Sequence, residues 1–297
     1  MRGRDLTDLL SLAAIWGASF LFIKMAIDAF APFALIQMRV GLAAASLLPL
    51  VILTGKTSQL FTHWKVLLAS GMLNATLPFL LYAYAAQSLG ASFLSVINAV
   101  TPAWGAAVGW LWFRDRLPRL SVFGLFVGFC GIVVLVWDKL TLTPVDGAGS
   151  QMLGTLAALG APVCYGIGVN HTKRYLNGVD PIVNATGSLT GATLVLLPFA
   201  IYTWPTGPIS FQAWTATILL AVLCTGFAYI MFFRLLASVG PTRGATVTFL
   251  APVFGVFWAV FLLEEPLTRN IVMGAAIVLT GSALVIGGGR LKSGTGR

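Results

Sequence analysis

The chain has 297 residues, of which 58% are hydrophobic and only 9% are charged, and its mean hydropathy is +0.91. A soluble domain carries about 25% charged residues, so this composition excludes a water-soluble protein and indicates one that lipid surrounds. The net charge of +9 would suit a nucleic-acid-binding protein, but its distribution along the chain argues against that function, as described below.

Apolar stretches of about 20 residues, the length that crosses a bilayer as a helix, follow one another with short connections. We therefore predict an all-α polytopic membrane protein with ten transmembrane helices. The basic start, Met1–Arg4, resembles that of a signal peptide, but the apolar run behind it has the length of a full span, and we expect it to be retained. In chain order the predicted spans are Leu9–Ala26, Phe33–Leu53, Lys65–Gln87, Ala91–Phe113, Leu120–Trp137, Gln151–His171, Pro181–Tyr202, Ala213–Leu236, Gly244–Leu263 and Ile271–Gly287.

Reactive side chains are few and scattered. The three cysteines, Cys130, Cys164 and Cys224, lie inside predicted spans without a metal-like spacing, and their odd number argues against a disulfide framework. The two histidines, His63 and His171, are far apart and lack acidic companions, and no HExxH, GxSxG or P-loop motif occurs. We expect no enzyme, no catalytic residues, no metal and no cofactor.

Lysine and arginine are unevenly distributed between the two sets of loops. If the N-terminus is inside, 14 of the 18 lie on that side, Lys24, Lys139 and Arg269 lie on the other, and Arg39 falls within the second span. Positive charge in short loops marks the cytoplasmic side. We therefore expect a multi-pass protein of the bacterial inner (plasma) membrane with cytoplasmic N- and C-termini and no nucleic-acid partner.

The sequence repeats itself at a constant offset, the one that separates Gly90 from Gly240. Each half holds five predicted spans, an odd number, so the second half enters the membrane from the opposite side, as in the inverted repeats of secondary transporters. The domains predicted are a first repeat over residues 1–137, an extracytoplasmic linker over 138–150 and a second repeat over 151–297. The repeated positions are Gly90/Gly240, Pro102/Pro252, Gly105/Gly255, Leu117/Leu267, Arg119/Arg269, Val122/Val272, Gly124/Gly274 and Gly131/Gly281.

Two copies of one motif carry a family resemblance. Ser95–Gly105 (SVINAVTPAWG) with Phe113–Leu117 (FRDRL), and Phe249–Gly255 (FLAPVFG) with Leu263–Leu267 (LEEPL), resemble the half-repeat of the EamA family of the drug/metabolite transporter superfamily. Asp115 stands where the family usually has Glu. The resemblance covers nearly the whole chain and implies ten helices in a 5+5 inverted-topology repeat, alternating access, and a likeness to exporters of aromatic and other neutral amino acids.

Polar and aromatic residues at membrane depth are the candidates for substrate contact, because buried polar groups in a span usually face a cavity or a partner helix. Asn74, Pro78 and Tyr82 share one helical face, and Trp16, Ser19, Phe20 and Ile23 form a stripe. Aromatic walls with a few orienting amides and hydroxyls suit an amphipathic ligand. The predicted substrate-binding residues are Trp16, Phe20, Asn74, Pro78, Tyr82, Asn98, Thr101, Trp104, Tyr165, Asn170, Tyr229 and Thr248.

Two basic residues lie within spans. Lys24, near the outer end of the first span, is positioned to snorkel towards the interface. Arg39 lies about two turns into the second span and needs a partner; a structural ion pair with Asp28 is favoured, and attraction of a substrate carboxylate is the alternative.

The scarcity of charge at membrane depth narrows the function. All nine acidic residues fall at predicted helix ends or in loops, whereas proton-coupled pumps keep a carboxylate or histidine relay inside the membrane, so facilitative transport is expected. The fourth, eighth and ninth spans lack a mid-depth cation for a phosphate substrate. We expect a monomer that exports neutral or aromatic amino acids; the alternatives are a multidrug or quaternary-cation exporter and, in a different class, a non-transporting scaffold or receptor.

Overall fold

The computed structural model describes residues 3–114, 118–137, 148–240, 244 and 246–294. Every regular element in this part of the chain is a helix, which confirms the predicted all-α fold. The elements are α1 (Gly3–Ala26), α2 (Pro32–Leu53), α3 (Thr57–Thr62), α4 (Trp64–Gly71), η1 (Met72–Thr76), α5 (Leu77–Ala86), α6 (Ala91–Asn98), α7 (Thr101–Phe113), α8 (Arg119–Val136), α9 (Ala148–Tyr175), α10 (Pro181–Tyr202), α11 (Phe211–Ile218), η3 (Leu219–Phe227), α12 (Ala228–Val239), α14 (Val247–Leu262) and α15 (Arg269–Gly294).

Among the described residues, eight helical stretches are long and apolar enough to cross a membrane, and two more apolar helices, Val247–Leu262 and Arg269–Val285, are shorter. The 16 residues of α14 rise about 24 Å, less than the roughly 30 Å of a bilayer core. Most of the predicted linker 138–150, Asp115 and Leu117 lie outside the described residues. The eight long stretches are Arg4–Ala26, Pro32–Leu53, Trp64–Ala86, Ala91–Phe113, Arg119–Val136, Gln151–Tyr175, Pro181–Tyr202 and Phe211–Val239.

Three predicted spans are interrupted rather than being single regular helices, although each remains one helical stretch long enough to cross a membrane. The third widens into the π-helix η1 between α4 and α5, and the eighth widens into η3 between α11 and α12. In the fourth, α6 ends at Asn98 and α7 begins at Thr101. Pro102 lies in the first turn of α7, where its missing N–H leaves the Asn98 carbonyl without the donor that a continuous helix would supply.

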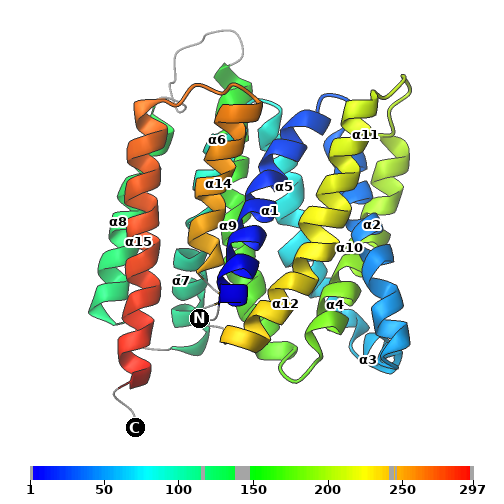
Figure 1. Cartoon of the computed structure of the whole chain (residues 1–297), viewed down its shortest axis with the longest axis horizontal. Helices are drawn as coiled ribbons and strands as arrows, with labels where there is room; N and C mark the ends of the chain where they lie inside the picture. Colours follow the sequence, from blue (N-terminus) through cyan, green and yellow to red (C-terminus); the bar gives the residue numbers. More distant parts are fainter. Residues whose placement is uncertain (1–2, 115–117, 138–147, 241–243, 245, 295–297) are drawn as a thin grey trace.

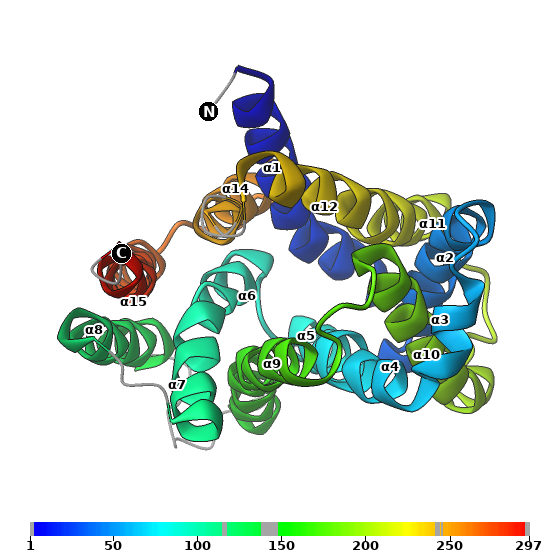
Figure 2. The same cartoon turned by 90° about the horizontal axis from the view of Figure 1, so that it is seen from below.

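The helices pack in pairs that join distant parts of the sequence. Figure 2 views the bundle along its helices, from the end that carries both termini. In this view the pair α8 and α15 lies at one side of the bundle, and the pair α2 and α10 lies towards the opposite side. Between them, α1 packs against α14, and α9 packs against α5 and α7. A Cβ on Gly124 would lie 2.7 Å from the carbonyl oxygen of Gly281, and one on Gly131 would lie 2.7 Å from the backbone nitrogen of Val278. Glycine at these positions therefore permits the close contact between α8 and α15.

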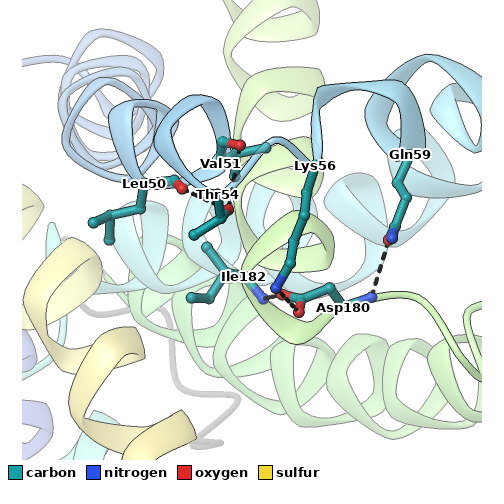
Figure 3. A network of polar contacts seen from close by, with 7 residues as sticks. All are labelled: Leu50, Val51, Thr54, Lys56, Gln59, Asp180 and Ile182. Carbon is teal, nitrogen blue, oxygen red and sulfur yellow. Dashed lines mark hydrogen bonds and ion pairs between the residues drawn. The ribbon is translucent and has the colours of Figure 1, made fainter.

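Polar contacts tie the bundle together at the end where both termini lie (Figure 1). The Lys56 ammonium lies 2.5 Å from Oδ2 of Asp180, which precedes α10, while Gln59 Oε1 accepts a hydrogen bond from the Asp180 N–H (Figure 3). Asp180 Oδ1 also accepts from the Ile182 N–H at 2.9 Å and so caps α10. The segment between α2 and α4 is thereby held to the start of α10.

A second polar cluster lies at the opposite end of the bundle. The Glu265 carboxylate, in the connection from α14 to α15, accepts from the Ala91 N–H at 2.6 Å, the Ser92 N–H at 3.1 Å and the Ser92 hydroxyl at 2.5 Å. The first amides of a helix have no intrahelical acceptor, and the carboxylate also complements the positive end of the helix dipole. Glu265 therefore serves as the N-terminal cap of α6.

Candidate functional site

The helices surround a cavity of about 290 Å³ in the middle of the bundle. Segments from α1, α2, η1, α5, α6, α7, α9, η3, α12 and α14 contribute to its wall, so residues from almost the full length of the chain meet there. Nine of the twelve residues expected to contact substrate line it: Trp16, Phe20, Asn74, Tyr82, Asn98, Thr101, Tyr165, Tyr229 and Thr248.

Aromatic rings form much of this wall. Phe20 of α1 meets Tyr82 of α5 edge to face, with ring centroids 5.3 Å apart. Phe79 and Tyr165 make a similar contact between α5 and α9 at 6.4 Å. Edge-to-face pairs are favourable because the positive edge of one ring meets the negative face of the other. The aromatic part of the wall thus comes from three helices, α1, α5 and α9.

The two π-helices place polar groups on the cavity. In η1, the Asn74 amide donates to the carbonyl and hydroxyl oxygens of Ser70, at 3.1 and 3.2 Å. In η3, the Thr225 hydroxyl donates to the carbonyl of Leu220, five residues earlier, at 2.9 Å. Wide turns of this kind are rare and occur often at functional sites. Here they bring Asn74 and Thr225 to the cavity from two separate regions of the chain.

The interruption between α6 and α7 supplies a third polar group. Because Pro102 cannot donate to the carbonyl of Asn98, that oxygen is free, and it accepts from the Thr101 hydroxyl at 2.8 Å. The Asn98 side-chain Oδ1 accepts from the Tyr82 hydroxyl at 3.1 Å and from Thr101 at 3.3 Å. The broken helix thus holds Asn98, Thr101 and Tyr82 in one hydrogen-bonded cluster at the cavity wall.

Arg39 is the cation of the cavity and was not among the expected contact residues. Its side chain is buried, with 6% exposed, and its Nε donates to the Thr225 hydroxyl oxygen at 3.1 Å. The guanidinium carbon lies 3.5 Å from the centre of the Phe79 ring, a cation–π contact. Asp28 is exposed, and no salt bridge joins it to Arg39 in the described part of the chain. The expected ion pair is therefore wrong.

Three expected residues do not line the cavity. Asn170 is buried between helices, where its amide donates to the carbonyls of Gly105 and Gly166, each at 2.8 Å. Trp104 is 38% exposed, and Pro78 is buried at the start of α5. A hydrogen bond between helices satisfies a buried amide as well as a ligand does, which is why the sequence did not separate Asn170 from Asn98.

Lys24 also lies away from the cavity. Its ammonium donates to the carbonyl of Ala86 at 2.7 Å, which joins α1 to the end of α5.

Nine further residues line the cavity. Ser19 and Ile23 were visible in the sequence as part of the stripe with Trp16 and Phe20, whereas a phenylalanine or valine inside an apolar span gives no signal of its own. No group of three or more histidine, cysteine, aspartate or glutamate side chains that could hold a metal occurs in the described ranges. The nine are Ser19, Ile23, Arg39, Phe79, Val169, Cys224, Thr225, Ala251 and Pro252.

Comparisons with known proteins agree on the class of protein. The model of the EamA-like transporter family matches residues 8–137 and 152–287. The uncharacterized transporter YvbV of Bacillus subtilis is 26% identical over 91% of this chain and 87% of its own length. A probable amino-acid metabolite efflux pump of Escherichia coli is 23% identical over 95% of this chain and 94% of its own.

One crystal structure, 17% identical in sequence, superimposes with a TM-score of 0.65 over 96% of this chain and 98% of the other, which establishes a shared fold. The family consists of transporters, in agreement with the expectation that the chain is not an enzyme. Matched by the family model over most of its length and built from apolar helices, the chain is a multi-pass membrane protein that belongs to the EamA-like transporter family.

Proposed function

We propose that this transporter exports small amphipathic metabolites, chiefly aromatic and other neutral amino acids, by alternating access. The observation that carries the proposal is the central cavity, which combines aromatic walls with a few amides and hydroxyls. Its volume of about 290 Å³ lies at the lower end of the range of roughly 300–1,000 Å³ typical of small-molecule sites. A ligand with an apolar ring and a small polar end matches this lining.

The proposed mechanism needs two halves of inverted topology, residues 1–137 and 151–297, joined by the linker 138–150. Several features support ten spans in a 5+5 arrangement. The π-helices η1 and η3 overlap when the halves are aligned at the repeat offset, with Asn74 matched by Cys224. The helix α1 packs on α14, while its counterpart α9 packs on α7, the counterpart of α14. Both termini lie at one end (Figure 1), as an even number of spans requires.

The uneven distribution of lysine and arginine supports cytoplasmic termini and a location in the bacterial inner membrane. On this assignment, the Lys56–Asp180 and Arg234–Asp8 ion pairs lie on the cytoplasmic side, and Glu265 caps α6 on the other. Alternating access requires such contacts to break and re-form as the two halves rock against each other. A single chain encloses the whole cavity, so we propose that the monomer is the transporting unit.

The charge of the cavity distinguishes the proposal from its main rival. An exporter of quaternary cations uses a carboxylate or an aromatic box; this cavity has aromatic walls, but the residues that line it include no acidic side chain and one cation, Arg39, which would repel a cationic substrate. The same feature supports facilitative transport, because no acidic group at the cavity can relay protons. The name of the Escherichia coli relative, a probable amino-acid metabolite efflux pump, points to the same substrate class.

Counterflow in proteoliposomes tests this proposal. Proteoliposomes that contain the purified protein and are loaded with unlabelled phenylalanine are expected to accumulate labelled phenylalanine, tryptophan, threonine or methionine without an imposed pH gradient. Accumulation of a quaternary cation, with none of any amino acid, would instead establish the rival function. A flux that rises steeply with a pH gradient alone would refute the facilitative mechanism.

A matched pair of variants ties transport to the cavity. Tyr82→Phe removes the hydroxyl that holds Asn98 Oδ1 and is expected to weaken substrate binding about 2- to 10-fold, the value of one hydrogen bond. Tyr84→Phe makes the same chemical change on the exposed face of α5 and is expected to transport like the wild type. Equal effects of the two substitutions would contradict a role for the cavity.

A further inference from the structure

Arg39 carries a positive charge that the surrounding protein does not neutralise. Arginine stays protonated in proteins, and a buried charge without a counter-ion is costly. The side chains that line the cavity include this one cation and no carboxylate. The two salt bridges in the described part of the chain, Lys56–Asp180 and Arg234–Asp8, involve other residues. A counter-ion for Arg39 must therefore come from outside the described protein.

The contacts of Arg39 leave a defined set of donors free. Its Nε is engaged by the Thr225 hydroxyl, and Phe79 covers one face of the guanidinium plane. These contacts fix the orientation of the group, while the two terminal nitrogens have no hydrogen-bond partner among the described residues. Two parallel N–H groups match the two oxygens of a carboxylate in a bidentate pair. The site thus presents a preorganised receptor for one planar anion.

The rest of the cavity offers an ammonium group aromatic faces and neutral oxygens but no carboxylate. One of these oxygens, Asn98 Oδ1, already accepts from two hydroxyls. We propose that Arg39 binds the carboxylate of the substrate, and that the transporter recognises amphipathic monocarboxylates whether or not they carry an amino group. This inference rests on the proposed export function. It names the carboxylate as the group that is recognised, so the substrates would include deaminated analogues of the amino acids.

A phosphate ester shares the anionic chemistry but fits less well. A phosphate dianion carries about twice the charge of a carboxylate near neutral pH, and no second cation lines the cavity to meet it. The aromatic wall formed by Phe20 and Tyr82 is available to the ring of either ligand. Phenyl phosphate is therefore the probe that separates a carboxylate site from a general anion site.

The test measures binding to the purified full chain in lipid nanodiscs by isothermal titration calorimetry. The ligands are L-phenylalanine, 3-phenylpropanoate, phenylalanine amide, phenethylamine and phenyl phosphate. For the wild type we expect both carboxylates to bind, and the other three ligands to bind at least about 10-fold more weakly, as loss of a charge-assisted hydrogen bond requires. In Arg39→Gln the preference for carboxylates is expected to disappear.

Two further variants control for folding and for charge. Arg39→Lys keeps the positive charge but loses the two parallel N–H groups, and it is expected to retain part of the preference for carboxylates. Lys24→Gln removes another positive charge from a span, away from the cavity, and is expected to keep all of it. Because the preference is a ratio measured within each variant, it does not depend on the fraction of protein that folds.

The outcomes separate this inference from the export function on which it rests. Wild-type protein that binds phenylalanine and its amide equally, or Arg39→Gln protein that keeps the carboxylate preference, would overturn the inference and leave the export function standing. Binding of phenyl phosphate as tight as that of 3-phenylpropanoate would overturn the monocarboxylate assignment. Wild-type protein that binds no carboxylate at all would overturn both.

Discussion

Replacing Glu265 by glutamine tests how the N-terminus of α6 is held to the connection between α14 and α15. The side chain keeps its shape, but one of its two acceptor oxygens becomes an NH2 group that cannot accept from the amides of α6. In the wild type, the carboxylate accepts from the Ala91 N–H, the Ser92 N–H and the Ser92 hydroxyl. At least one of these bonds is lost in Glu265→Gln, and the others lose their ionic character.

The expected magnitude follows from these contacts. A hydrogen bond to a charged group contributes about 1.5–3 kcal/mol and a neutral one about 0.5–1.5 kcal/mol. The favourable interaction between the negative charge of Glu265 and the positive end of the α6 dipole, worth about 0.3–1 kcal/mol, is lost as well. We therefore expect the capped state to be destabilised by about 1–3 kcal/mol, which corresponds to a local opening about 5- to 150-fold more frequent.

Hydrogen–deuterium exchange with mass spectrometry measures this opening directly. Peptides that cover residues 88–98 are expected to exchange faster in Glu265→Gln by this factor, while peptides from α8 and α15 keep their rates. Glu264→Gln is the matched control, because the neighbouring carboxylate is exposed. Unchanged exchange over residues 88–98 in Glu265→Gln, or equal acceleration in both variants, would refute the capping role.

Gly90→Ala perturbs the same contact from the opposite side. A Cβ at this position would lie 2.7 Å from Oε2 of Glu265, although the backbone φ of −75° suits alanine well. The added methyl group must displace the carboxylate, so the variant is expected to reproduce the exchange pattern of Glu265→Gln. This contact supplies a physical reason for glycine at position 90.

The remaining predictions concern stability and binding. Burial raises the pKa of Asp180, but the hydrogen bonds from Lys56 and the Ile182 N–H outweigh it and leave the pKa below its usual value. A lowered pKa stabilises the fold above about pH 4, and this contribution, below about 1 kcal/mol for so exposed a pair, is lost as the pH falls through the folded-state pKa. The melting difference between wild type and Asp180→Asn should therefore shrink as the pH is lowered from 7 to below about 4; a difference that grows as the pH falls would contradict this. Gly17→Ala places a Cβ 2.6 Å from the carbonyl oxygen of Ala251 and should cost about 1–3 kcal/mol in thermal unfolding, whereas Gly105→Ala, with open space around its Cβ, should be neutral. Asn98→Ala removes the acceptor of two hydroxyls and should weaken phenylalanine binding by calorimetry about 10-fold; unchanged affinity would exclude Asn98 from the site.

The sequence predicted the helical class, the approximate spans and half of the residues that line the cavity, because each depends on local composition or helical spacing. Trp16, Ser19, Phe20 and Ile23 lie on one face of a helix in any fold, and all four line the cavity. Interruptions within spans were harder to predict. Ala228 occupies the position of Pro78 in the second repeat, yet both regions contain a π-helix. The π-helix therefore does not depend on a proline at this position.

Partners across long separations could not be predicted at all. Arg39 donates to Thr225, 186 residues away, whereas the nearby Asp28 seemed the more natural partner. Asn170 and Asn98 are the same residue type inside predicted spans, yet one ties α9 to α7 and the other faces the cavity. A buried amide needs hydrogen bonds, and a neighbouring helix or a ligand can supply them equally well.

Apolar composition and its periodic interruption determined by themselves that this chain lies in lipid as a bundle of helices, because no solvent but hydrocarbon suits such a surface. Tertiary structure alone decided which polar groups face the cavity. That decision depends on which helices pack together, and packing is set by shape, as the close contact of Gly124 with Gly281 illustrates. The unpaired charge of Arg39 is an example. The sequence shows an arginine within a predicted span, but only the fold shows that no carboxylate lines the cavity beside it.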